Sequence, residues 1–235
     1  MKPITSLFAA IAVLFFNPTV GDGSPPAVPA SACESIEWCD IWISHANETN
    51  LPRVLLIGDS ITRDYYPGVE KRLDRKAYVA RLATSRFASD PVLLQEIALV
   101  LDNTKFDIIH FNNGMHGWQH TEAEYQSAFP KLLETIRSHA PRAKLLWATT
   151  TPLKVSRPST AAEASDERVA ARNAIGLEVV KGKGIVVDDL NALVRGHPEY
   201  HSDNVHFNAE GIRLEATQVA ACIEPLLSHR IIAVR

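Results

Sequence analysis

Residues 53–62 read RVLLIGDSIT and mark the passage from a strand into a helix. The run from Arg53 to Ile57 is short and almost wholly apolar, as in strands that are buried on both faces. Ser60 follows a glycine and an aspartate, at the position where a helix opens. The unpaired backbone N–H groups of a first helical turn favour negative charge. A serine in this place has the exposure and the donors that a nucleophile needs, although a simple helix cap would show the same sequence.

Runs of this kind alternate with helical patterns over most of the chain. Further strands are predicted at residues 77–82, 106–111, 143–149 and 184–187. Helices are predicted at residues 61–73, 92–101, 122–139, 163–181 and 209–227. We expect Pro67 to kink or interrupt the first helix, Pro225 to end the last one early, and Asn208 to cap its start. The alternation predicts an α/β fold in which helices cover both faces of a five-stranded parallel sheet. Right-handed crossovers place the carboxyl ends of its strands on one edge, where sites form.

The composition is that of a globular protein with a substantial core. Of the 235 residues, 46% are hydrophobic and 22% are charged, which fits one α/β domain better than two. The net charge is -3, and the Lys and Arg residues are dispersed along the chain. Because the sequence has no basic stripe, it argues against nucleic acid as a partner.

Residues 1–21 are typical of a signal peptide. Lys2 provides a positive charge, and the apolar run at residues 4–16 is too short to span a bilayer. We expect cleavage after residue 21, with an uncleaved membrane anchor as the alternative. Residues 22–50 are then a leader and an amino-terminal segment, and the folded domain covers residues 51–235. The expected location is the periplasm or the extracellular space, with no stable membrane partner.

The cysteines and histidines give little sign of a metal. Cys33 and Cys39 are close enough in sequence to form a small disulfide staple after export. Cys222 lies in a helical pattern, where we expect it to be simply buried. His116 and His120 are four residues apart, but no third ligand accompanies them and no Cys-His spacing suggests zinc. The sequence therefore predicts neither a metal nor a cofactor.

A second polar segment lies near the end of the chain, directly before the last predicted helix. Residues 202–207 read SDNVHF, so Asp203 and His206 are three residues apart in a turn. The carboxylate can bind one imidazole nitrogen and fix the tautomer, which leaves the other nitrogen to accept the proton of Ser60. A purely local contact between Asp203 and His206 is the alternative interpretation.

Taken together, the two segments resemble the SGNH (GDSL-type) hydrolase superfamily. Its members carry a GDS motif after the first strand and a DxxH motif before the final helix, and residues 58–60 and 203–206 match both in the same order. The resemblance extends over most of residues 52–227 and implies a three-layer, flavodoxin-like fold. It also implies ester hydrolysis without a cofactor, with Ser60 as the nucleophile and Asp203 and His206 as its acid–base partners.

The same resemblance implies an oxyanion hole built from three donors. The first is the N–H group of Ser60. The second is usually a glycine after the second strand, but residues 81–86 read RLATSR, and we expect Ser85 to supply this N–H group instead. The third is an asparagine side chain after the third strand, where residues 111–118 read FNNGMHGW. Asn113 is the predicted donor and Asn112 the reserve, although Asn-Gly is also a favoured turn pair.

Polar and small residues dominate the segments that should surround the site. They are Thr62, Arg63, Thr84, Ser85, Asn112, Asn113, His116, Gly117, Thr150 and Thr151. A long acyl chain needs an apolar wall, because each buried CH₂ group contributes about 0.8 kcal/mol, and no such wall is evident. We expect substrate contacts from Trp118, Thr150, Arg63 and His116, with the indole facing a sugar ring. The alternative is that Arg63 and Trp118 only pack or pair on the surface, and that His116 is a surface or pocket-rim histidine. The predicted activity is removal of short acyl groups, such as acetyl, from carbohydrate. The alternatives are a lipid esterase, an O-acyltransferase with the same triad, or a binding protein with an impaired oxyanion hole.

Overall fold

A central β-sheet organises the part of the chain that the computed structural model describes, residues 33–155 and 163–227. Within these residues the sheet has six strands, in the order β1-β3-β2-β4-β5-β6. The strands are β1 (Cys39–Ile43), β2 (Arg53–Gly58), β3 (Tyr78–Thr84), β4 (Ile108–Phe111), β5 (Lys144–Ala148) and β6 (Val186–Asp188). Since β2 to β6 are parallel, their carboxyl ends share one edge of the sheet.

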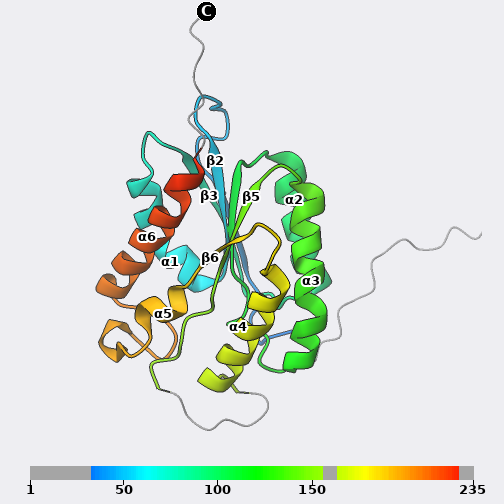
Figure 1. Ribbon diagram of the computed structural model, residues 1–235, viewed down its shortest axis with the longest axis vertical. Helices are drawn as coiled ribbons and strands as arrows, with labels where there is room; N and C mark the ends of the chain where they lie inside the picture. Colours follow the sequence, from blue (N-terminus) through cyan, green and yellow to red (C-terminus); the bar gives the residue numbers. More distant parts are fainter. Residues whose placement is uncertain (1–32, 156–162, 228–235) are drawn as a thin grey trace, which may run out of the picture.

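Helices cover both faces of the sheet, which confirms the expected three-layer architecture (Figure 1). One face carries α1 (Ser60–Arg72), α5 (Leu190–Val194) and α6 (Ala209–Ile223). The other face carries α2 (Pro91–Asn103), α3 (Glu122–His139) and α4 (Asp166–Val180). The short helix α5 was not expected from the sequence. It follows β6 directly and packs against α6.

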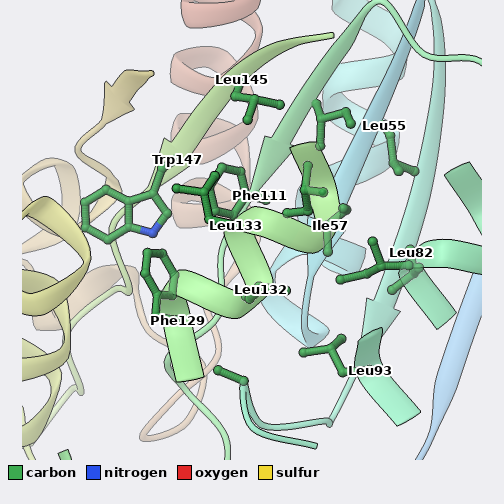
Figure 2. Close-up of a cluster of buried hydrophobic side chains, with 14 of the residues drawn as sticks. Leu55, Ile57, Leu82, Leu93, Phe111, Phe129, Leu132, Leu133, Leu145 and Trp147 are labelled. Atoms are coloured by element: carbon green, nitrogen blue, oxygen red, sulfur yellow. The ribbon is translucent and has the colours of Figure 1, made fainter. Parts of the chain in front are cut away.

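Alternate side chains of each central strand enter two hydrophobic clusters, one on each face. Leu55 and Ile57 of β2 belong to the cluster beneath α2 and α3, together with Phe129 of α3 (Figure 2). Val54 and Leu56 of the same strand belong to the cluster beneath α1 and α6. Burial on both faces explains why this strand is apolar at consecutive positions rather than alternating ones.

Strand β1 corrects the expected sheet of five parallel strands. It pairs antiparallel with β3, with Cys39 opposite Thr84. It lies at the edge of the sheet, and side chains such as Trp42 are exposed, so it lacks the continuous apolar run that identifies a buried strand. Because β1 belongs to the sheet, the folded domain begins before residue 51. The expected signal peptide and residues 22–32 of the leader lie outside the described residues.

The sequence predicted the ends of α6 correctly, but not the effect of the proline within α1. Pro67 does not interrupt α1, which continues past it. A proline removes the hydrogen bond to the carbonyl four residues earlier, here that of Arg63, and both residues are on the exposed side of the helix, where water can solvate that carbonyl. At α6 the expectations are confirmed. The Asn208 side chain caps its start, and a 3₁₀ turn containing Pro225 follows its end.

The three cysteines are all free. Cys33 and Cys39 do not form the staple that their spacing allows. Cys222 is half-buried rather than fully buried. Burial, together with the nearby carboxylate of Asp188, raises the pKa of its thiol to about 11. Across residues 33–155 and 163–227, no helix is both long enough and apolar enough to cross a bilayer.

Candidate active site

Ser60 is placed by the tight turn between β2 and α1. A side chain at Gly58 would collide with Thr62, because a Cβ atom there would lie 2.0 Å from Thr62 Oγ1. Asp59 caps the helix by accepting a hydrogen bond from the N–H group of Ile61 at 2.9 Å. Ser60 is therefore the first residue of α1. Its own N–H group has no partner among the described residues, so it can donate to a developing negative charge.

His206 and Asp203 complete a hydrogen-bonded chain that begins at Ser60. The distance from Ser60 Oγ to His206 Nε2 is 2.8 Å, and that from His206 Nδ1 to Asp203 Oδ2 is also 2.8 Å. The loop that holds them is closed by an isolated antiparallel bridge between His201 and Phe207. The three side chains that the two sequence motifs single out are thus within hydrogen-bond distance of one another.

Backbone hydrogen bonds keep Asp203 ionised. The N–H groups of Val205 and His206 both donate to Asp203 Oδ1 at 2.7 Å. The His206 N–H group contributes most, and together with the other donors it lowers the pKa of Asp203 to about 2. An ionised Asp203 accepts a hydrogen bond from the Nδ1–H group of His206, which leaves Nε2 unprotonated and able to act as a base. Because the pKa is depressed on folding, this carboxylate stabilises the fold above about pH 4, and the contribution is lost as the pH falls towards 2.

Asn113 and Asn112 differ sharply in their side-chain partners. Asn112 is buried, and its amide nitrogen donates to the Ala148 carbonyl at 2.7 Å and to Thr150 Oγ1 at 3.2 Å. Asn113 is half-buried, and its amide nitrogen donates only to the Arg86 carbonyl, at 2.9 Å. One N–H bond of Asn113 is therefore available to a ligand, whereas both N–H bonds of Asn112 are used within the fold.

Ser85 does not have the free N–H group that the sequence analysis expected of it. That group donates to the Trp38 carbonyl at 3.2 Å, and the Ser85 hydroxyl donates to Glu37 at 2.6 Å. The next N–H group along the loop, that of Arg86, makes only a 3.4 Å contact with Thr84 Oγ1. The Asn113 amide binds the carbonyl of Arg86, so Arg86 lies beside the other candidate donor. The Arg86 N–H group therefore replaces that of Ser85 as the candidate second donor.

Comparison with known families identifies the family of this chain. The model of the GDSL-like lipase/acylhydrolase family matches residues 56–214, which include both motifs. The chain belongs to this family. It is therefore an ester-bond hydrolase of the SGNH (GDSL) superfamily. A comparison with curated proteins finds no significant match.

Solved structures similar to this acylhydrolase have the same fold at low sequence identity. A carbohydrate esterase of family 3 from Talaromyces cellulolyticus matches with a TM-score of 0.61 and 19% identity, over 74% of this chain and 97% of its own. A carbohydrate acetylesterase from Sinorhizobium meliloti matches with a TM-score of 0.62 and 14% identity, over 75% of this chain and 100% of its own. A GDSL-like lipase from Bacteroides thetaiotaomicron matches with a TM-score of 0.61 and 16% identity, over 74% and 89%.

Two of the expected substrate-binding residues of the acylhydrolase are committed to the fold. Thr150 is 3% exposed, and its carbonyl accepts hydrogen bonds from Asn173 and Asn191. Trp118 is half-buried, with the Arg172 guanidinium 4.2 Å from the centroid of its ring. The guanidinium of Arg172 therefore packs against the indole of Trp118.

Arg63 and His116 make contacts of a different kind, with the amino-terminal segment. The Arg63 guanidinium lies 4.9 Å from the ring centroid of Trp38. His116 Nδ1 lies 3.0 Å from a carboxylate oxygen of Glu34, and its ring meets that of Trp38 edge-on at 6.4 Å. Trp38 therefore joins these two predicted residues, although nothing in its own sequence surroundings distinguishes it.

Arg172 is a further residue that the sequence analysis did not identify. It is fully buried, and its guanidinium donates to the carbonyls of Gly114, His116 and Gly117. Burial, with the nearby charge of Arg168, lowers its pKa to about 10. A residue far along the chain, on α4, thus supports the loop that carries Asn113. The signal in the sequence is its spacing, because Arg172 lies three residues after Val169 and four before Gly176, on the buried side of α4.

The histidines of this loop are engaged by protein groups. The ring of His120 stacks on that of Phe87 with a centroid distance of 4.5 Å, and His116 pairs with Glu34. Among the described residues, no group of three or more His, Cys, Asp or Glu side chains is arranged to hold a metal ion.

The pH dependence of the acylhydrolase should show a single protonation on the acid side. Protonated His206 cannot accept the Ser60 proton, whereas Asp203 stays ionised down to about pH 2. A plot of log kcat/KM against pH should therefore rise with a limiting slope of about one. His139→Gln serves as a control and should leave the profile unchanged. His139 is the last residue of α3, and its ring is paired with Asp102 of α2. A limiting slope near two would contradict the assignment.

Proposed function

We propose that this acylhydrolase is a secreted esterase that removes short acyl groups, acetyl above all, from carbohydrate by a Ser60–His206–Asp203 mechanism. The observation that carries the mechanism is the hydrogen-bonded chain from Ser60 Oγ to His206 and on to Asp203, with both distances at 2.8 Å. The case for secretion is the signal-peptide pattern of residues 1–21.

The proposed reaction has two acyl-transfer steps. Ser60 Oγ attacks the ester carbonyl while His206 Nε2 takes the hydroxyl proton, and Asp203 stabilises the imidazolium that forms. The tetrahedral intermediate collapses, the sugar alcohol leaves with the proton from His206, and the acyl group stays on Ser60. Water then attacks the acyl-enzyme with His206 again as the base, which releases the carboxylic acid and restores the Ser60 hydroxyl.

In this proposal, three hydrogen-bond donors stabilise the negative charge of each tetrahedral intermediate. They are the N–H group of Ser60, the N–H group of Arg86 and the side-chain amide of Asn113. The first has no internal partner, the second makes only a weak contact, and the third has one N–H bond available. Donors that are positioned before the reaction stabilise charge without any cost of reorganisation.

The proposed preference for short acyl groups rests on the polar and small residues of the segments around the catalytic turn, such as Thr62 and Asn113. A cavity of about 10 Å³ lies beside this turn, with Asp59 and Asn112 among its lining residues, but Ser60 and His206 do not line it. A larger cleft of about 400 Å³ lies between α2 and α3, with Leu94 and Ala128 in its walls, but neither Ser60 nor His206 lines it. Two of the solved structures similar to this chain, both carbohydrate esterases by name, agree with a sugar ester as the substrate.

We expect kcat/KM for p-nitrophenyl acetate to exceed that for p-nitrophenyl octanoate by about tenfold or more. Each additional CH₂ group of the longer chain would add about 0.8 kcal/mol of binding only if an apolar wall buried it. Initial rates on the two esters, followed by assay of acetate released from an acetylated polysaccharide, measure the preference. Faster turnover of the octanoate, without release of acetate, would identify a lipid esterase.

One further measurement separates hydrolysis from acyl transfer. The purified mature chain is incubated with p-nitrophenyl acetate in the presence and absence of an acceptor oligosaccharide, and free acetate is compared with acetylated sugar. We expect free acetate in both cases, and Ser60→Ala provides the background rate. Acetylated sugar as the main product would make the chain an O-acyltransferase that uses the same residues.

A further inference from the structure

A short amino-terminal segment, residues 34–38, is hydrogen-bonded to the loop after β3. The N–H group of Trp38 donates to Ser85 Oγ at 2.9 Å, and the Ser85 hydroxyl donates to Glu37 Oε2 at 2.6 Å. The N–H group of Ser85 completes the set by donating to the Trp38 carbonyl at 3.2 Å. Ser85 is only 1% exposed, so these hydrogen bonds are shielded from competing water.

The same segment also reaches the loop after β4. The N–H group of Gly117 donates to Glu34 Oε1 at 2.9 Å, and His116 Nδ1 lies 3.0 Å from Glu34 Oε2. Glu37 ties the two ends of the segment together, because its Oε1 atom accepts the N–H group of Glu34 at 2.8 Å. Residues 34–38 therefore connect two loops that are far apart in the sequence.

These two loops carry two of the three donors in the proposed oxyanion hole. Arg86 directly follows Ser85, and Asn113 precedes the turn that contains His116. The loops are also joined to each other, since the Asn113 amide donates to the Arg86 carbonyl at 2.9 Å. A shift of Ser85 would move the adjoining peptide of Arg86, and with it both the Arg86 N–H group and the carbonyl that orients Asn113.

We propose that Glu37, Trp38 and Ser85 form a clamp that positions the Arg86 and Asn113 donors for the transition state. The proposal rests on the esterase mechanism given above. These three residues are positioning residues, since they act through Arg86 and Asn113 and not on the substrate. The hydroxyl of Ser85 is essential to the clamp because it donates one hydrogen bond and accepts another.

The test compares Ser85→Ala, Glu37→Ala and Glu37→Gln on p-nitrophenyl acetate. Ser85→Ala and Glu37→Ala should each lower kcat by about tenfold, less than the 10²–10³-fold expected when a donor is removed outright, with KM changed less than twofold. Glu37→Gln keeps one acceptor oxygen and should recover part of the loss. The Ser85→Ala/Glu37→Ala double variant should be little slower than Ser85→Ala, because both changes break the same contact.

Ser44→Ala is the matched control. Its hydroxyl donates to the Val79 carbonyl at 2.8 Å. Ser44 therefore links the residue after β1 to the start of β3, at the end of that strand away from the loop that carries Ser85. This variant should lose comparable thermal stability and keep the kcat of the wild type. An equal loss of kcat in Ser44→Ala, or an unchanged kcat in Ser85→Ala and Glu37→Ala, would overturn the clamp. If Ser85→Ala does not fold, the two Glu37 variants decide the question. Full activity of Ser60→Ala would instead overturn the esterase mechanism itself.

Discussion

Ser60→Ala and His206→Ala should each lower kcat/KM on p-nitrophenyl acetate by about 10⁴–10⁶-fold. Ser60 supplies the only oxygen that can carry the acyl group in the proposed mechanism, and His206 Nε2 is the group within 2.8 Å that can accept its proton. Because the two residues act as one unit, the double variant should be little slower than either single variant.

Single-turnover and steady-state rates, corrected for spontaneous hydrolysis, measure this effect. Ser202→Ala removes an exposed hydroxyl group from the loop that holds Asp203 and His206, and it should keep the wild-type rate. Thermal unfolding of all variants separates a loss of chemistry from a loss of fold. Hydrolysis at the wild-type rate by Ser60→Ala would show that another group carries out the reaction.

The place of each catalytic motif at the sheet edge could be predicted from short-range patterns, whereas the pairing of Ser60 with His206 and Asp203 was implied only by the resemblance to SGNH hydrolases. A strand that is apolar on both faces must be buried, so Ser60 lies at the carboxyl edge of the sheet. Asp203 and His206 precede a helix whose start is capped by Asn208, which brings the second motif to the same edge. Each of these inferences uses residues that are near one another in the sequence.

The choice between Asn112 and Asn113 needed long-range information. Asn112 and Asn113 follow the end of β4, and the sequence does not show which groups each side chain will meet. In the structure the Asn112 amide meets the Ala148 carbonyl of β5, whereas the Asn113 amide meets the Arg86 carbonyl of another loop. Both partners come from segments that only the folded sheet brings close.

The contacts of several predicted site residues also depend on distant parts of the chain. Ser85 loses its free N–H group to Trp38, which belongs to a segment that was expected to lie outside the domain. Trp118 lies against Arg172 of α4, and Thr150 is held by Asn191 of α5. Polar side chains near an active edge look alike in sequence whether they bind substrate or hold loops together.

Asn113→Ala should lower kcat by about 10²–10³-fold with little change in KM, the usual effect of losing one oxyanion donor. The free N–H bond of Asn113 would meet the carbonyl oxygen only when that oxygen becomes negatively charged, so ground-state binding is unaffected. The backbone of Asn113 should stay in place, because the Tyr125 hydroxyl donates to its carbonyl.

Asn112→Ala is the variant that makes this prediction specific. Its amide donates to Ala148 and Thr150, so its removal leaves a buried carbonyl without a donor and should cost about 1–3 kcal/mol of stability. We therefore expect Asn112→Ala to unfold at a lower temperature and keep most of its kcat. Asn113→Ala should show the reverse pattern, with a large loss of kcat and a smaller loss of stability. A larger loss of kcat in Asn112→Ala than in Asn113→Ala, with the stability of Asn112→Ala unchanged, would contradict the assignment. In that case Asn112 would be the oxyanion donor, because its removal would affect the reaction and not the fold.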